Sequence, residues 1–432
     1  MINLGSQKYT PILVIVLALG LLGSIYLYAD AKAELAANMI ETQRLQTDFS
    51  QLTSNYDQLS AQIETLQDSN TELEARIAEL ESTPSETTPP PVVVVERNEV
   101  TLNISGSGTV RNVIFLIGDG MGVGQLSAAE YVNGQESLSI SSMPYKALVT
   151  TYSESAFVTD SAASGTALAT GYKTNNGRIS MSTSGETLTT VVEVAEENGA
   201  STGIVSNTRV THAIPACFMA HVSSRGMESA IASQVLDSGV DVVLGGGSTY
   251  FDSLDTSGAG YTVVTSTDEL HDFDSGKVLG LFAPGYMSYD DYRDPDVEPS
   301  LAEMTYKSIE LLSHDPDGFF LMVEGGRIDH ASHDNDFDAT MSEVFAFDEA
   351  VLVALEYASS RNDTLVLVTA DHETGGLMIV GGYDYTGLSY KWISDDHTGS
   401  MVPVYAYGPR AEEAMAFTDN TDIGRFLIEL FQ

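Results

Sequence analysis

The strongest constraint on the fold is a set of short, continuous apolar segments that alternate with helical patterns from Val113 onward. Uninterrupted apolar runs fit strands buried on both faces, which is typical of parallel sheets. We predict strands at Val113 to Ile117, Thr202 to Ser206, Asp241 to Leu244, Phe319 to Val323, Leu365 to Thr369 and Val404 to Tyr407. We predict helices at Thr187 to Asn198, Met227 to Ser238, Leu301 to Ser313 and Asp338 to Ser359. The alternation indicates an α/β fold with a mostly parallel sheet covered on both faces.

Polar residues follow four of the predicted strands directly. Asp119 follows the first strand, Glu324 follows another, and Asp371 and His372 follow a third, while residues 207–212 form a polar loop after the strand that ends at Ser206. Because ligands bind beyond the carboxyl ends of parallel strands, these segments are expected to converge on one site.

A serine nucleophile is predicted at Ser161, between Asp160 and a run of small residues that extends to Ala167. Small residues let a helix begin tightly packed there, and the free N–H groups of its first turn would face an anion near the hydroxyl. A serine hydroxyl is a weak nucleophile until another group activates it, and the sequence has no nucleophile elbow with a Ser-His-Asp order. Metal ions are the activator that the remaining motifs indicate.

Three segments supply ligands of the kind that metal ions need. Residues 324–333 contain a glutamate, an aspartate and two histidines, residues 371–372 add an Asp-His pair, and His397 lies in a further polar segment. Imidazole and carboxylate ligands without thiolate suit catalytic Zn²⁺, and additional carboxylates suit Mg²⁺. Arg225 would bind two oxygens of a phosphate group with its planar guanidinium.

Composition excludes one class of partner and limits the cysteine chemistry. The chain has 19 Lys and Arg against 61 Asp and Glu, giving a net charge of −42, which argues against binding nucleic acid through its phosphates. The single cysteine, Cys217, rules out an intrachain disulfide and lies in an apolar stretch, where we expect a buried structural thiol.

The N-terminal residues 1–29 predict a membrane anchor. Residues 12–28 form an uncharged apolar run, with Lys8 before it and Asp30 after it, which is just long enough to span a bilayer. The basic flank places the N-terminus in the cytoplasm, so the rest of a single-pass protein of the cell membrane would be extracytoplasmic. A cleaved signal peptide, with Ala29-Asp30-Ala31 as the cleavage site, is the alternative, and it also exports the chain.

Residues 30–82 predict a coiled-coil stalk. Leucine recurs every seven residues at positions 45, 52, 59, 66, 73 and 80, with Asn70 as a polar residue at the other core position. A lone amphipathic helix packed on the downstream domain is the alternative. Residues 83–98 are rich in proline and predict an extended linker, which leaves residues 99–432 as the catalytic domain. We therefore expect a homo-oligomer, such as a dimer, held by the stalk alone or by the stalk and the catalytic domain together.

Taken together, these motifs resemble those of the alkaline phosphatase family. Residues 158–166 resemble its active-site signature, and residues 323–333, 369–372 and 397–400 resemble its metal motifs in the same order. The resemblance implies an α/β/α sandwich with two zinc ions and usually one magnesium ion. It implies small phosphate monoesters as substrates and a phosphoserine intermediate.

The resemblance also implies roles for individual residues. Its first zinc ion would be held by Asp329, His333 and His397, and its second, beside Ser161, by Asp119, Asp371 and His372. Arg225 would bind phosphate and Asp160 would orient it. A third, magnesium-type site would be reached by Asp119 and Glu324, with His212 and His330 nearby. The family usually has a hydroxyl ligand where this chain has Ile214, so we expect weak occupancy of the third site.

Two other functions remain open from the sequence. A related hydrolase acting on phosphodiesters or sulfate esters would use a similar ligand set, although the Ser161 and Arg225 motifs favour phosphate monoesters. A non-catalytic surface stalk protein is the other alternative, and the nearly complete set of ligands argues against it.

Overall fold

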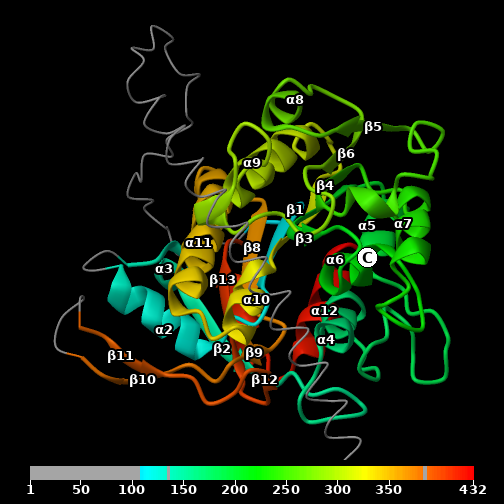
Figure 1. The fold of residues 1–432 in the computed structure, drawn as a ribbon. Coiled ribbons are helices and arrows are strands. Elements are labelled where there is room, and N and C mark those ends of the chain that lie inside the picture. Colours follow the sequence, from blue (N-terminus) through cyan, green and yellow to red (C-terminus); the bar gives the residue numbers. More distant parts are fainter. Residues whose placement is uncertain (1–107, 134–136, 383–386) are drawn as a thin grey trace, which may run out of the picture. The chain divides into compact units, whose positions relative to one another are not determined.

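The computed structural model of the chain describes residues 108–133, 137–382 and 387–432 (Figure 1). The predicted anchor (1–29), stalk (30–82) and linker (83–98) lie outside these residues. Within the described ranges, no helix has both the length and the apolar character needed to cross a membrane.

A nine-stranded sheet forms the centre of the domain, and most of its strands are parallel, as predicted. Strand β13 is the antiparallel exception, since it pairs antiparallel with both β8 and β2. In spatial order the strands are β2 (Tyr145–Val149), β13 (Val402–Tyr407), β8 (Thr364–Thr369), β1 (Asn112–Gly118), β7 (Phe319–Gly325), β3 (Ser201–Arg209), β4 (Val242–Gly246), β6 (Lys277–Leu281) and β5 (Tyr261–Val264).

Helices cover both faces of this sheet (Figure 1), which gives the α/β/α layers that the resemblance implied. One face carries α2 (Val123–Val132), α3 (Ser139–Ser142), α9 (Leu301–Leu312) and α11 (Phe337–Ser359). The other carries α4 (Ser161–Thr170), α5 (Val191–Glu197), α6 (Ala213–Met219) and α12 (Asn420–Leu430), with α7 (Glu228–Asp237) packed against α6.

Shorter elements complete the described part of the domain. The helices are α8 (Thr267–His271), α10 (Arg327–His333) and the 3₁₀ segments η1 (Ser248–Tyr250), η2 (Asp290–Tyr292) and η3 (Ala411–Ala416). Two small antiparallel pairs join β10 (Met378–Gly381) to β11 (Ser389–Lys391) and β9 (Glu373–Thr374) to β12 (His397–Thr398).

Local sequence signals explain where the main helices begin. Helix α9 starts with a capping box in which Ser300 and Glu303 satisfy each other's backbone N–H groups, and α5 starts with the same arrangement at Thr190 and Glu193. The side chain of Asp336 accepts a hydrogen bond from the third residue of α11. These caps fix the first turns of helices that pack on the sheet.

The core lies between the sheet and its two helical layers. Every residue of the neighbouring strands β1 and β7 is buried, as expected for strands covered on both faces. Phe218 of α6 contacts Phe115 of β1 and Phe320 of β7, with ring centroids 6.3 and 6.0 Å apart. The ends of β1 and β7, where the site residues follow, are thus held by dense apolar packing.

All six predicted strands and all four predicted helices are present, with small shifts at their ends. One prediction was wrong in part: residues 207–209 are not loop, because β3 continues to Arg209 through an irregular register with β4. Strands β2, β5 and β6 were not predicted. Each is short, and β2 and β5 lie at the two edges of the sheet, where β2 has one buried residue and β5 has two.

Candidate active site and metal-ligand groups

Ser161 lies at the first position of helix α4, as predicted, with only 2% of its surface exposed. Asp160 caps this helix, because its side chain accepts a hydrogen bond from the backbone N–H of Ala163 at 3.0 Å. The Oγ atom of Ser161 lies 3.3 Å from Nε2 of His372 and 3.5 Å from Nη1 of Arg225. The hydroxyl is therefore placed between an imidazole nitrogen and a guanidinium group.

The guanidinium of Arg225 is held from two sides. Its Nη1 donates to Oδ2 of Asp160 at 3.3 Å, and its Nη2 donates to Nε2 of His212 at 3.0 Å. Asp160 is itself fixed by the backbone N–H of Gly177, which is 3.0 Å from both carboxylate oxygens. Burial works to lower the pKa of Arg225, but Asp160 and nearby carboxylates raise it overall, so the group stays cationic.

The predicted metal ligands gather in three groups among the described residues, and in each group the potential ligand atoms lie within 4.8 Å of one another. The groups are Asp329, His333 and His397 (the first group), Asp119, Asp371 and His372 (the second group), and Asp119, His212 and Glu324 (the third group). The grouping matches the assignment that the resemblance implied.

In the first group two histidines direct the same kind of nitrogen toward Asp329. Nδ1 of His333 bonds the carbonyl of Asp395 at 2.7 Å, and Nδ1 of His397 bonds the carbonyl of Thr159 at 2.9 Å. A carbonyl only accepts, so each Nδ1 carries a proton, and in the neutral form of each ring Nε2 has the lone pair. The two Nε2 atoms lie 3.1 Å apart, which neutral rings tolerate only with a cation or a proton between them.

The second group is built at the ends of the adjacent strands β1 and β8. Nε2 of His372 lies 3.0 Å from Oδ2 of Asp371 and 3.5 Å from Oδ1 of Asp119. All three side chains are fully buried, and both oxygens of Asp119 lack a hydrogen-bond partner. Gly120, with a φ of +73°, lets the segment after Asp119 pass close to Thr374 and Asp329, because a Cβ there would lie 2.8 Å from Thr374 and 2.9 Å from Asp329.

The third group combines two carboxylates with one histidine. Oε2 of Glu324 accepts hydrogen bonds from the hydroxyls of Ser206 and Thr208, whereas Oε1 has no hydrogen-bond partner and faces Nδ1 of His212 at 3.9 Å. Because the guanidinium of Arg225 donates to Nε2 of His212, the proton of this neutral ring sits on Nδ1. In this arrangement His212 presents an N–H, not a lone pair, to the third group.

Two further residues were expected near the third group. Ile214 is fully buried, and its Cδ1 contacts Gly165 of α4, so it offers no ligand atom. His330 lies outside the three groups; its ring centroid is 5.7 Å from that of His212 and its Nδ1 accepts from Arg327 at 2.8 Å. Tyr286, which the sequence did not indicate, covers both histidine rings at 5.8 and 4.4 Å.

The electrostatics of the three groups fit bound cations. Burial raises the pKa of Asp119 well above its ordinary value, helped by the neighbouring Asp371, and raises that of Glu324 to about 8. Burial and the nearby Arg225 lower the pKa of His212 to about 3. Buried carboxylates with unpartnered oxygens are costly unless a positive charge is near, and divalent cations supply it. The ligand set is therefore suited to metal ions.

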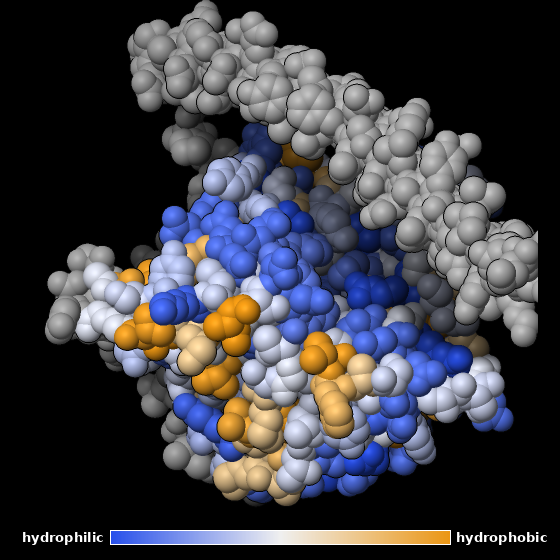
Figure 2. Space-filling model, turned by 60° about the horizontal axis from the view of Figure 1, so that its bottom comes forward, coloured by the Kyte–Doolittle hydropathy of each residue, from blue (hydrophilic) through white to orange (hydrophobic). Residues whose placement is uncertain are grey.

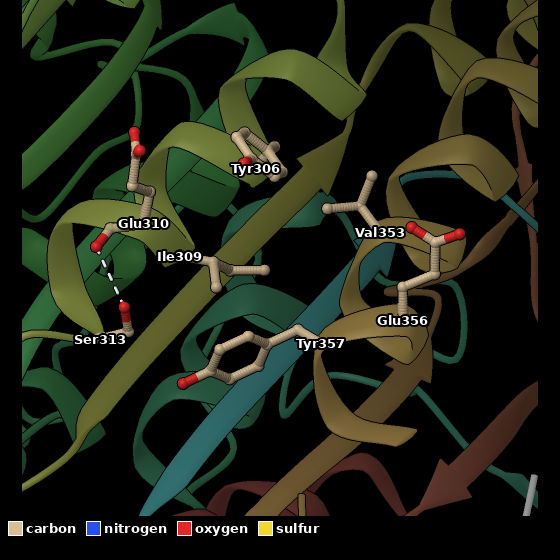
Figure 3. A pocket seen from close by; sticks show the side chains of 7 residues that line it. All are labelled: Tyr306, Ile309, Glu310, Ser313, Val353, Glu356 and Tyr357. Carbon is tan, nitrogen blue, oxygen red and sulfur yellow. Dashed lines mark hydrogen bonds between the residues drawn. The ribbon is translucent and has the colours of Figure 1, made fainter. Parts of the chain in front are cut away.

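One surface feature lies near this site, and a second lies away from it. The end of the domain that carries β10, β11 and β12 shows apolar patches on an otherwise hydrophilic face (Figure 2), and Phe157, close before Ser161, is 91% exposed. Separately, a groove of about 270 Å³ lies between α9 and α11 (Figure 3), lined by residues such as Ile309 and Tyr357. None of the ligand residues lines that groove, so it is not the candidate site.

A pH dependence of stability follows from Glu324. Its pKa in the folded protein is about 8 against an ordinary 4.5, so its stabilising contribution is complete below pH 4.5 and is lost as pH rises through 8. We expect the metal-free protein to melt at progressively lower temperature from about pH 5 to pH 8. Added Zn²⁺ at pH 8 should raise the melting temperature. Scanning calorimetry after chelation measures both effects.

The matched variant is Glu324→Gln, which keeps the shape but does not titrate. It should show a flatter pH dependence than the parent when both are metal-free. Equal slopes for parent and variant would contradict the assigned pKa.

Comparisons with known proteins agree with the geometry. The alkaline phosphatase family profile matches residues 110–393. Alkaline phosphatase 4 of Bacillus subtilis is 33% identical over 75% of this chain and 89% of its own length. Solved structures of a cold-active alkaline phosphatase from a Shewanella species and of alkaline phosphatase from the Antarctic bacterium TAB5 match with TM-scores of 0.70 and 0.69, at 32% and 33% identity. They cover 74% and 75% of this chain and 100% and 98% of their own. The chain belongs to the alkaline phosphatase family.

Proposed function

We propose that the chain hydrolyses small phosphate monoesters outside the cytoplasm through a phosphoserine at Ser161. The observation that carries the proposal is the position of the Ser161 hydroxyl, which touches both His372 of the second group and Arg225. A nucleophile, a cationic clamp for an anion and two groups of buried ligands thus meet at one oxygen atom.

Arg225 binds the phosphate group of the substrate. Asp160 and His212 hold its guanidinium from two sides, so little side-chain freedom is lost when an anion binds. A guanidinium pairs best with two oxygens of a phosphate. A monoester has three unsubstituted oxygens and a diester only two, so a diester would bring its second substituent against Arg225 or the ligand groups. This favours monoesters over the phosphodiester alternative.

Ser161 then attacks phosphorus. Its Oγ forms the new P–O bond as the bond to the leaving oxygen breaks, and the hydroxyl proton passes to water, because the Nε2 lone pair of His372 would be used by the cation of the second group. The leaving alcohol takes up a proton, and the free N–H groups at the start of α4 face the transferred phosphoryl group. Water attacks the phosphoserine in a second step, which releases inorganic phosphate and restores the hydroxyl.

Zn²⁺ is the cation we propose for the first and second groups. The first group offers two imidazole nitrogens and the second offers one, in both cases with carboxylate oxygens and no thiolate. Zinc accepts such a set of ligands readily. When bound, these ions lower the pKa of the serine hydroxyl and stabilise negative charge on the leaving oxygen. Asp329, His333 and His397 would hold one ion, and Asp119, Asp371 and His372 the other.

The third group is proposed to bind Mg²⁺ weakly. Magnesium requires near-octahedral oxygen ligation, and this group offers Asp119 and one free oxygen of Glu324. Ile214 supplies no oxygen, and His212 would have to give up its bond to Arg225 before its Nδ1 could bind a cation. Occupancy of this group therefore competes with the hydrogen bond that holds the phosphate clamp.

Residues 1–82 are proposed to tether the catalytic domain. The apolar run at 12–28, the basic residue before it and the heptad leucines support a single-pass anchor in the cell membrane and a self-associating stalk. The catalytic domain would then work outside the cytoplasm as part of a homo-oligomer, reached by soluble phosphate esters.

Replacing the nucleophile tests the covalent mechanism. Ser161→Ala should lower turnover of a chromogenic phosphate monoester by at least about a thousandfold, because no other group can form the covalent bond. Zinc content measured by atomic absorption should stay at the parent value. The exposed Ser184→Ala is the control and should keep full turnover. Residual activity within about tenfold of the parent would sink the phosphoserine proposal, and faster turnover of a diester than of a monoester by the parent would favour the alternative.

Restoring a hydroxyl tests the third group. Ile214→Thr should strengthen the response of turnover to added Mg²⁺, while Ile214→Val, which has the same shape without the oxygen, should not. An unsatisfied hydroxyl at this buried position would cost about 1 to 3 kcal/mol of stability in the metal-free variant. If the parent already saturates with tightly bound Mg²⁺ and the threonine variant behaves alike, another group must replace the missing ligand.

Membrane extraction tests the anchor. After expression of the full chain, we expect the protein to stay with membranes at high pH and to dissolve only in detergent. A chain that begins at residue 30 should be released. Release of the full chain by alkaline washing alone would contradict a spanning anchor.

A further inference from the structure

Glu373 and Thr374, which directly follow the ligand residues Asp371 and His372, have no role in the proposed mechanism although both are buried. They form strand β9, which pairs with β12 so that Thr374 lies opposite His397. Strand β9 therefore lies next to segments that carry metal ligands. Within β9, Thr374 contacts the ligand side chains of Asp329 and His372 directly.

We propose that Thr374 is a positioning residue whose single hydroxyl links the first and second ligand groups and fixes which nitrogen of His372 faces a metal ion. The inference rests on the proposed function only in that both groups bind cations. Oγ1 of Thr374 donates to Oδ1 of Asp329 at 2.5 Å and lies 3.2 Å from Nδ1 of His372. Asp329 belongs to the first group and His372 to the second.

The direction of these two hydrogen bonds follows from the atoms involved. A hydroxyl has one proton and can accept through its lone pairs, whereas an ionised carboxylate only accepts. The proton of Thr374 must therefore point to Asp329, and the hydroxyl oxygen must accept from His372. His372 then carries a proton on Nδ1, and in the neutral ring the lone pair is on Nε2, which faces Asp119, Asp371 and the nucleophile.

The same hydroxyl also orients the first group. The Oδ1 atom of Asp329 that accepts from Thr374 is the atom that lies 3.4 Å from Nε2 of His333 and 3.6 Å from Nε2 of His397. In the first group the histidines are oriented by backbone carbonyls, while in the second group His372 has no carbonyl at its Nδ1 and relies on Thr374. One side chain thus serves both groups.

The backbone around Thr374 is held as firmly as its side chain. Its N–H donates to the carbonyl of Gly120 at 3.1 Å, and its own carbonyl accepts from Nε2 of Gln125 at 2.6 Å. Gln125 also donates to Glu373, whose other oxygen accepts from the hydroxyl of Thr398, beside His397. These bonds tie β9 to the Asp119 loop and to β12, so the hydroxyl of Thr374 has little freedom to move.

The experiment compares Thr374→Val, which keeps the shape but lacks the hydroxyl, with Thr374→Ser, which keeps the hydroxyl. Zinc affinity is measured by competition with a chromogenic chelator on the metal-free full-length protein. We expect the valine variant to bind zinc about 10- to 100-fold more weakly and the serine variant to stay close to the parent. Thr305→Val, which removes a buried hydroxyl that bonds only within α9, is the control and should match the parent.

A second readout addresses the tautomer directly. Nitrogen NMR of the eight ring-labelled histidines should show His372 with its proton on Nδ1 in the zinc-bound parent, as His212, His333 and His397 also have, and only His372 should lose this signature in Thr374→Val. A merely structural threonine would not change the tautomer of a ligand ring.

The outcomes separate this inference from the proposed function. A parent that binds no zinc would overturn the metal-based function itself. A parent that binds zinc while Thr374→Val binds equally well, or a serine variant as weak as the valine variant, would overturn only the role of Thr374. If the valine variant fails to fold, as judged by circular dichroism, the serine variant decides, because the inference requires it to retain the parent's affinity.

Discussion

The structure depends on one electrostatic constraint: four carboxylates are buried close together. Asp119, Glu324, Asp329 and Asp371 are each at most 5% exposed, and they belong to three ligand groups, of which the second and third share Asp119. Such a cluster is unstable as bare charge, since desolvation and mutual repulsion both oppose ionisation. The surrounding imidazoles, hydroxyls and the Arg225 guanidinium reduce this cost in part. Divalent cations would remove most of it, so the site is arranged to be completed by them.

The parallel sheet is what makes this crowding possible. Strands β7, β1 and β8 are neighbours and run the same way, so Glu324, Asp119 and Asp371 follow strands that end at one edge. Dense apolar packing below this edge leaves the polar residues no alternative position. Helix α4, which lies in the helical layer with α5, α6 and α12, brings Ser161 to the same edge. The candidate ligands lie close together because the parallel strands that precede them end at the same edge of the sheet.

Much of this arrangement was predictable from the sequence, and the reasons are physical. Buried parallel strands have a strong signal of their own, and a carboxylate directly after such a strand has a predictable position, so Asp119, Glu324 and Asp371 were assigned correctly to one edge. The edge strands β2 and β5 were missed because an edge requires little apolar patterning. The extension of β3 was missed because the polar residues Asn207 and Thr208 are satisfied inside the fold, by Glu343, Ser206 and Glu324.

Residues that act through hydrogen bonds were harder to predict than ligands. Thr374 and Gln125 gain their roles only from distant partners, such as Asp329 and Glu373, that no local pattern indicates. Tyr286 likewise covers His212 and His330 from a segment with no motif. For Ile214 the sequence predicted a missing ligand. The structure adds that Nε2 of His212, a member of the same group, accepts a hydrogen bond from Arg225.

The spacing of the ligands along the chain has a consequence for how the protein is made. The first group joins residues 329 and 397, the second joins 119 and 371, and the proposed nucleophile Ser161 begins helix α4. Contacts between residues so far apart in sequence form late, because the chain must lose conformational entropy to close a long loop before the contact can stabilise it. A chain still emerging from the ribosome lacks part of the third group until residue 324, part of the second until residue 372 and part of the first until residue 397. Metal uptake is therefore coupled to completion of the fold, and a truncated or misfolded domain would have little affinity for the ions that it needs.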